Sequence, residues 1–190
     1  MSKYRDVQCG FFKGVVFDFG VMITNYTGLG GVVICPDEIE GLPVVGTGCH
    51  AFCGAPNLEL TLSKNHTDVM YAEFEGHHNL VGITLPNSVV TISAEAFLCC
   101  DNLERITFGS GLITIGVDAF LGCHKLTKIV IPSNVRTICQ DAFANCIGLK
   151  SVTMSAATAI MRGKRKVKKL FVRKGTEIFL LNREDSKNAT

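Results

Sequence analysis

Cysteine and histidine are the residues of this sequence most able to do chemistry: nine cysteines and five histidines occur among 190 residues. Both residue types bind transition metals, and a cysteine beside a histidine can act as a nucleophile. Cys49, His50 and Cys53 form one candidate group, and the pair His77-His78 follows further along the chain. The spacings typical of zinc sites, above all C-x-x-C, do not occur, so we expect no metal site and no cofactor.

No catalytic motif places these side chains in a known arrangement. The sequence has no glycine-rich phosphate-binding loop, no nucleophile elbow and no paired carboxylates at a recognisable spacing. The stretch GLGG at 28–31 precedes the apolar Val32-Val33-Ile34, a pattern typical of a hairpin turn. We therefore expect a non-enzymatic protein with no catalytic residue.

A repeat of 22 or 23 residues organises the chain. Five phenylalanines mark it, each is followed six residues later by a leucine, and three repeats have a cysteine between the two. The predicted core therefore contains Phe52, Phe74, Phe97, Phe120 and Phe143, the leucines Leu103, Leu126 and Leu149, and the cysteines Cys100, Cys123 and Cys146. Such a period indicates stacked units, none of which can bury its apolar face alone.

Each repeat is expected to provide a strand, a turn, a short second strand and a helical turn. Leu103, Ile106 and Phe108 have the alternation of a strand with one face inward. Phe97, Cys100 and Leu103 are spaced three apart, which predicts a tight helical or 3-10 turn. Because the repeats are periodic, equivalent strands should pair in parallel and build a solenoid.

The cysteines at the shared repeat position are interpreted as buried, reduced thiols, because free cysteine packs as a small hydrophobic residue. Neighbouring coils should stack about 4.8 Å apart, inside the Cα range of a disulfide, so oxidation stays open as an alternative. We expect Cys123→Ser to destabilise the fold by burying a hydroxyl, and Cys123→Ala to be almost tolerated.

Charge is unevenly distributed along the chain. The net charge is +2, from 19 basic and 17 acidic residues, yet segment 162–174 has eight basic residues and no acidic one. Its most compact part is the basic segment Arg162, Lys164, Arg165, Lys166, Lys168 and Lys169. It is a candidate contact for nucleic acid or an anionic membrane surface, or else a solvated loop that needs no partner.

The outward strand positions are the candidate partner-binding residues. One column of them is rich in threonine, and a second contains Arg105 and Lys128, which would repel each other unless an anion lay between them. The candidates on this surface are Thr84, Arg105, Thr107, Lys128, Val130, Lys150, Ser151 and Thr153.

The repeat resembles the BspA-like, or Treponema-type, class of leucine-rich repeats. The match is closest over 89–154, in VVTISAEAFLCCDNLERITF, LITIGVDAFLGCHKLTKIVIP and VRTICQDAFANCIGLKSVTM. Residues 22–53 and the stretch KKLFVRKGTEIFLLN are similar to the terminal units of that family. The resemblance implies a right-handed superhelix, mainly β, with a parallel sheet on its concave face, and it implies surface adhesion for many members.

We expect one leucine-rich-repeat domain over 1–190. An N-terminal strand and hairpin cap should occupy 1–45, about five repeats 46–155, and a closing segment and tail 156–190. The leading prediction is a monomeric module that binds a partner protein through the concave sheet, in its finer form a surface adhesin. The alternative is an intracellular scaffold or anion-binding module that uses segment 162–174. No apolar leader follows Met1, which favours the cytoplasm, whereas the resemblance implies the cell surface or secretion.

Overall fold

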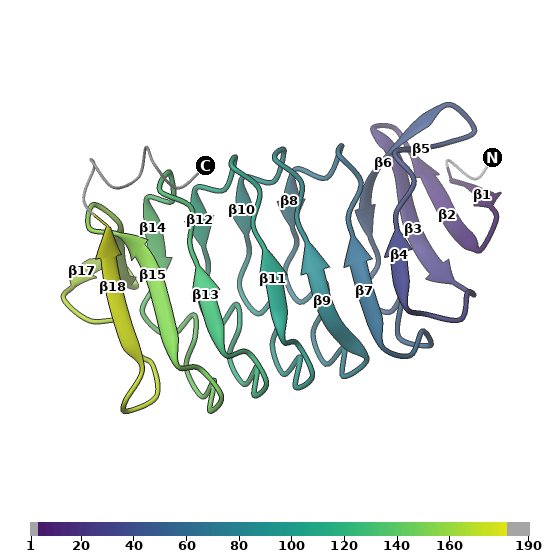
Figure 1. Cartoon of the computed structure of the whole chain (residues 1–190). Helices are drawn as coiled ribbons and strands as arrows, with labels where there is room; N and C mark the ends of the chain where they lie inside the picture. Colours follow the sequence, from purple (N-terminus) through teal and green to yellow (C-terminus); the bar gives the residue numbers. More distant parts are fainter. Residues whose placement is uncertain (1–3, 182–190) are drawn as a thin grey trace.

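The computed structural model describes residues 4–181 as a solenoid built from strands and turns, in which successive coils stack along one axis (Figure 1). Each regular coil gives one longer strand to one side of the stack and one shorter strand to the other side. We call the two sides the long-strand face and the short-strand face. No helix of the described part is long and apolar enough to cross a membrane.

The long-strand face consists of parallel strands from successive coils. Its first part is a four-stranded sheet of β4 (Val32–Ile34), β7 (Leu58–Thr61), β9 (Leu80–Thr84) and β11 (Arg105–Thr107). A three-stranded sheet of β13 (Lys128–Val130), β15 (Ser151–Ser155) and β18 (Glu177–Leu181) continues it. β11 and β13 lie side by side, so the two sheets form one continuous face (Figure 1).

The short-strand face is a six-stranded sheet. It contains β8 (Asp68–Val69), β10 (Thr91–Ile92), β12 (Thr114–Ile115), β14 (Thr137–Cys139), β16 (Ala159–Arg162) and β17 (Arg165–Val167). The first five strands pair in parallel, whereas β17 folds back on β16 as an antiparallel hairpin. That hairpin changes the last coil and becomes important below.

A separate five-stranded sheet precedes the repeats. Its strands are β1 (Arg5–Cys9), β2 (Phe12–Phe17), β3 (Gly20–Tyr26), β6 (Leu42–Thr47) and β5 (Glu38–Ile39), in that order. Tyr26 joins it to the first repeat: its N–H donates to the carbonyl of Ala51 at 2.7 Å, and its ring centroid lies 5.7 Å from that of Phe52. The first coil therefore has a covered end.

The helical or 3-10 turns that the sequence predicted are single hydrogen-bonded turns, and residues 4–181 contain no helix. Alternate N–H groups, those of Glu95, Phe97 and Cys99, donate to the next coil instead of their own. Their acceptors are the carbonyls of Val117, Ala119 and Leu121. Glu95 and Cys99 also have φ angles of 58° and 56°, in the left-handed region that interrupts a right-handed helix.

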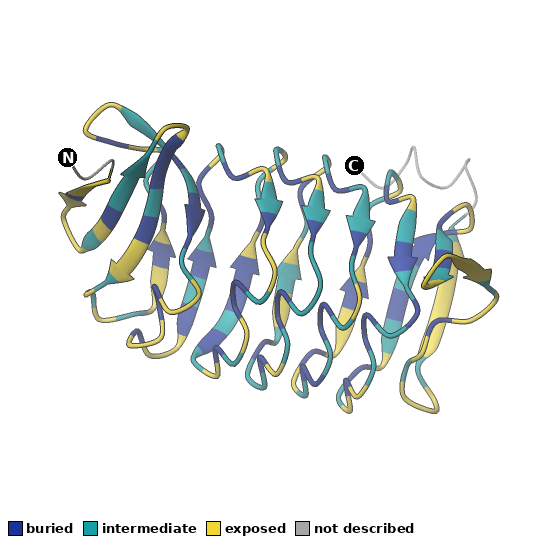
Figure 2. Ribbon diagram, turned by 180° about the vertical axis from the view of Figure 1, so that it is seen from behind, coloured by how far each residue is buried: buried dark blue, intermediate teal, exposed yellow. Residues whose placement is uncertain are grey.

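The core is a set of columns that run through the coils. The ring centroids of Phe74, Phe97, Phe120 and Phe143 follow one another at 5.3, 5.0 and 5.2 Å, with nearly parallel planes. All five repeat phenylalanines are buried, as are the three leucines and three cysteines predicted for the core. Figure 2 shows buried positions recurring at the same place in successive coils. Dispersion between identical neighbours thus holds each coil to the next.

A β-bulge accommodates the repeat that is one residue short. Leu58 pairs with Leu80, whereas the next residue, Glu59, pairs with Gly82, so Val81 is the extra residue. From Glu59 onward the coils keep a 23-residue register. The outward residues of the long-strand face can therefore form straight columns.

Candidate functional site

The register of the long-strand face arranges its outward residues in two columns. Pairing defines the columns within β4–β11 and within β13–β18, and the 23-residue repeat connects β11 to β13. The first column is Val32, Glu59, Gly82, Arg105, Lys128, Ser151 and Glu177. The second is Ile34, Thr61, Thr84, Thr107, Val130, Thr153 and Phe179.

All eight residues predicted from sequence for partner binding lie on this face or at its margin. Thr84, Arg105, Thr107, Lys128 and Val130 are exposed, and Ser151 and Thr153 are half-buried. Lys150 is exposed just before β15, where its N–H donates to the carbonyl of Thr127 at 2.8 Å.

Arg105 does not have the environment that the sequence predicted. Its guanidinium reaches across Gly82 to pair with Glu59 two strands away, and it also contacts the Glu104 carboxylate at 3.1 Å. Gly82 makes this possible, because a Cβ there would lie 3.2 Å from Oε2 of Glu59. Two carboxylates of the same chain therefore balance Arg105, and no external anion is needed. Lys128, by contrast, has no ion pair within residues 4–181.

The missing side chain at Gly82 also leaves a shallow hollow of about 150 Å³ on this face. Val32 and Arg105 border it, together with the threonines of β7, β9 and β11. Pockets for whole small molecules measure about 300–1,000 Å³. The hollow therefore suits a single side chain of a larger partner.

Apolar side chains are exposed at both ends and in the middle of the face, which sequence reasoning largely missed. The exposed fractions are 78% for Val32, 66% for Ile34, 54% for Val130 and 49% for Phe179. Only Val130 was predicted. Val32 and Ile34 come before the regular repeat, and Phe179 follows an irregular coil, so no periodicity assigned them to this column. The apolar alternation around Val33 was the available signal.

The basic segment lies elsewhere, on the hairpin of β16 and β17 at the last coil. Its six predicted residues, from Arg162 to Lys169, are all exposed. None of them forms an ion pair with another residue of the described chain. The segment is thus a concentration of unbalanced positive charge, separate from the columns of the long-strand face.

Cys53 lies between two histidines at the start of the array. Its Sγ is 3.6 Å from Nδ1 of His50 and 3.7 Å from Nε2 of His77. Burial, and then the neighbouring Cys49, raise the pKa of Cys53, while burial lowers the pKa of His77. Both shifts favour the neutral thiol and imidazole, so the contact is a neutral one. Across residues 4–181, no three histidine, cysteine or acidic side chains are grouped so as to hold a metal ion.

A second histidine group crosses three coils. The Asp101 carboxylate contacts Nδ1 of His78 and Nδ1 of His124, each at 3.0 Å. These three residues occupy the same repeat position, so the carboxylate bridges its neighbours above and below. The sequence placed them in one column, and the structure adds that the middle member connects the other two.

The fold and the repeat have clear counterparts among known proteins. A family model described as "BspA type Leucine rich repeat region" matches six copies over residues 47–164. No curated protein matches the chain.

Solved bacterial structures share the fold. A Treponema pallidum leucine-rich repeat protein is 23% identical over 94% of this chain and 84% of its own, with a TM-score of 0.52. A "leucine rich cell surface protein" from Faecalibacterium prausnitzii is 22% identical over 82% of this chain and 44% of its own, with a TM-score of 0.61. A leucine-rich repeat protein from Bacteroides capillosus is 24% identical over 80% and 99%, with a TM-score of 0.52.

Proposed function

Because the chain belongs to the BspA-type leucine-rich-repeat family, we propose that it is a non-enzymatic module that binds a partner protein through its long-strand face. The observation that carries this proposal is the run of exposed apolar residues, Val32, Ile34, Val130 and Phe179, within one continuous outward face. Apolar groups gathered on one surface with a polar surround mark interaction sites. The seven strands of this face extend over about 30 Å at the usual strand spacing, which matches a protein surface better than a small molecule.

The chemistry of the face indicates what the partner offers. Lys128 is the unpaired charge near the middle of the face, and Val130 is its apolar neighbour two residues on. A partner with a carboxylate opposite Lys128 and an apolar side chain opposite Val130 would complement both. Arg105 contributes less than its charge suggests, because Glu59 and Glu104 already neutralise it.

Display at the cell surface, as an adhesin, is the finer form of this proposal. The F. prausnitzii protein of the same fold is described as a cell surface protein, which supports it. A recognition face without a catalytic motif also suits adhesion, in which binding is the whole function.

The test compares two matched substitutions. Val130→Glu places a charge on the long-strand face, and Val90→Glu places the same charge at an exposed valine just before β10 of the short-strand face. Partners are captured on immobilised protein from extracts of the surrounding cells and matrix, and they are identified by mass spectrometry. We expect capture to fall at least tenfold with Val130→Glu and to persist with Val90→Glu. Equal capture by the two variants would contradict the proposal.

The second candidate function is anion binding by the basic segment, favoured by its six exposed and unpaired charges. It would serve an intracellular scaffold or an attachment to nucleic acid or anionic lipid. Replacing Lys164, Arg165 and Lys166 by glutamine should then abolish binding that the Val130→Glu variant retains. Such binding should weaken steeply between 50 and 200 mM salt, roughly as counterion release requires.

A further inference from the structure

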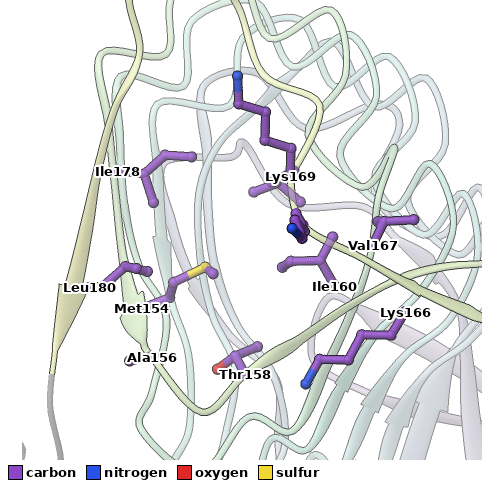
Figure 3. A pocket seen from close by; sticks show the side chains of 11 residues that line it. Met154, Ala156, Thr158, Ile160, Lys166, Val167, Lys169, Ile178 and Leu180 are labelled. Carbon is purple, nitrogen blue, oxygen red and sulfur yellow. The ribbon is translucent and has the colours of Figure 1, made fainter.

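The last coil contains a pocket that the regular coils do not have. It measures about 670 Å³ and lies between β15 and β18 on one side and β16 and β17 on the other (Figure 3). In Figure 3, Met154, Ile178 and Leu180 lie on one side, opposite Ile160 and Val167. The pocket is thus the space between the two faces of the solenoid, which core side chains fill elsewhere.

The sequence explains why this space is empty. One repeat length after Phe143 the chain has Lys166 in place of the next core phenylalanine. Lys166 lies in the antiparallel hairpin opposite Met161, so it does not enter a stacked turn. No aromatic side chain lines the pocket. The column of stacked rings therefore ends at Phe143, and the following coil has nothing to fill its interior.

The lining combines an apolar interior with a cationic rim. Met154, Ile160 and Leu170 are buried at the base, whereas Ile178 and Leu180 remain exposed to solvent along one wall. Three lysines, Lys166, Lys168 and Lys169, complete the lining. The side chains of Lys166 and Lys169 lie at opposite ends of the pocket (Figure 3).

Size and charge together select the occupant. The volume lies within the range of small-molecule sites, about 300–1,000 Å³, and apolar walls with a few polar groups are typical of them. A second copy of the chain would bring two basic segments together, which is unfavourable. An apolar body with a negative head group satisfies both the walls and the lysines.

We propose that this pocket binds an anionic amphiphile: a linear acyl or alkyl chain lies between the two faces, and a carboxylate or phosphate head contacts the lysines of the rim. The proposal is independent of protein recognition by the long-strand face, because the two sites share no residue. Each added methylene that the walls cover should tighten binding by roughly fourfold.

The experiment is calorimetric titration of the intact chain with defined amphiphiles below their micelle concentrations. The probes are decanoate, dodecanoate, dodecyl phosphate and dodecyltrimethylammonium. We expect dodecanoate to bind about tenfold more tightly than decanoate, since it has two more methylenes. The cationic probe should not bind. The ratio between dodecanoate and dodecyl phosphate distinguishes a carboxylate from a phosphate head. No binding of either anionic probe would overturn the proposal, as would equal binding of the cationic one.

Two variants locate the site. Ala156→Phe puts a ring at an exposed residue of the pocket lining and should reduce dodecanoate affinity at least tenfold. Lys166→Gln with Lys169→Gln should also reduce it about tenfold, whereas the control Lys13→Gln with Lys125→Gln removes two exposed charges elsewhere and should change it less than twofold. Unchanged midpoints of thermal unfolding verify that the variants fold. Full affinity in folded Ala156→Phe would place binding outside this pocket and overturn the proposal.

Discussion

The conserved position of the cysteines within the repeat has a polar reason as well as an apolar one. The Sγ atoms of Cys100, Cys123 and Cys146 donate to the carbonyls of Phe74, Phe97 and Phe120, at 2.9, 3.2 and 3.0 Å. Each thiol thus connects its coil to the preceding one. The sequence suggested a purely hydrophobic column, because the acceptors are 26 residues away and become neighbours only in the stacked fold.

This contact changes the expected result of substituting Cys123. A serine hydroxyl at this position would find the Phe97 carbonyl as acceptor, so it would not be buried without a partner. We expect Cys123→Ser and Cys123→Ala to lower the free energy of unfolding by similar amounts, about 1–2 kcal/mol each. Urea unfolding followed by circular dichroism measures both. A serine variant less stable than the alanine variant by over 2 kcal/mol would show that the hydroxyl cannot make this bond.

Alkaline pH should destabilise the fold through the same column. Burial raises the pKa of Cys100 to about 12 from an ordinary value of 9.0. Because the folded state favours the neutral thiol, its contribution to stability is complete below pH 9 and is lost as the pH rises towards 12. Urea midpoints measured from pH 8 to 11 should therefore fall. The decline should be shallower in Cys100→Ala, and an identical pH profile in that variant would exclude this thiol as a cause.

At the scale of one element, the coil between Phe52 and Phe74 differs from the others by a buried polar network. Glu73 occupies the position that alanine has in the other repeats, and its side chain is buried. Its carboxylate accepts from the backbone N–H groups of Thr47 and Met70 and from the Thr47 hydroxyl, and it lies 3.0 Å from Nε2 of His66. The network joins the N-terminal sheet to the repeats through one side chain.

Replacing Glu73 by alanine therefore separates two expectations. The repeat pattern alone predicts a gain in stability from Glu73→Ala, since alanine is the usual residue there. The structure predicts a loss of about 3–5 kcal/mol, because two backbone donors and His66 would stay buried without this partner. Urea unfolding decides, with Glu75→Ala, an exposed acid two residues on, as the control that should change little. A stabilised Glu73→Ala variant would show that the network is not worth its burial.

At the scale of the whole molecule, the nine cysteines separate into classes by position. Cys9, Cys49, Cys53 and Cys99 are exposed, whereas Cys35, Cys100, Cys123 and Cys146 are buried, and Cys139 is intermediate. All nine are free thiols. A maleimide should therefore modify the four exposed residues rapidly in the native protein, and the four buried ones at the rate of unfolding. Peptide mass spectrometry assigns the sites. Rapid modification of Cys123 would contradict the stacked core, and pairs that react only after reduction would reveal disulfides.

Sequence reasoning predicted what depends on periodicity and missed what depends on single departures from it. The phenylalanine, leucine and cysteine columns follow from the repeat, because identical coils must stack in register. The Arg105–Glu59 pair needed the space above Gly82, and the terminal pocket needed the hairpin that removes Lys166 from the core. Both depend on how a local exception meets its neighbours, which a one-dimensional pattern does not contain. The outward residues Ile34 and Phe179 were missed for the same reason.

The hydrogen bonds between coils, in both faces and in the turns, have a mechanical consequence. Because they run along the stacking axis, tension applied between the two ends of the array would load them one coil at a time rather than together. Each coil that detaches would release about 23 residues, or roughly 75 Å of extended chain. The array would thus lengthen in steps under force and shorten again when the load falls, and a tether between two moving bodies requires both behaviours.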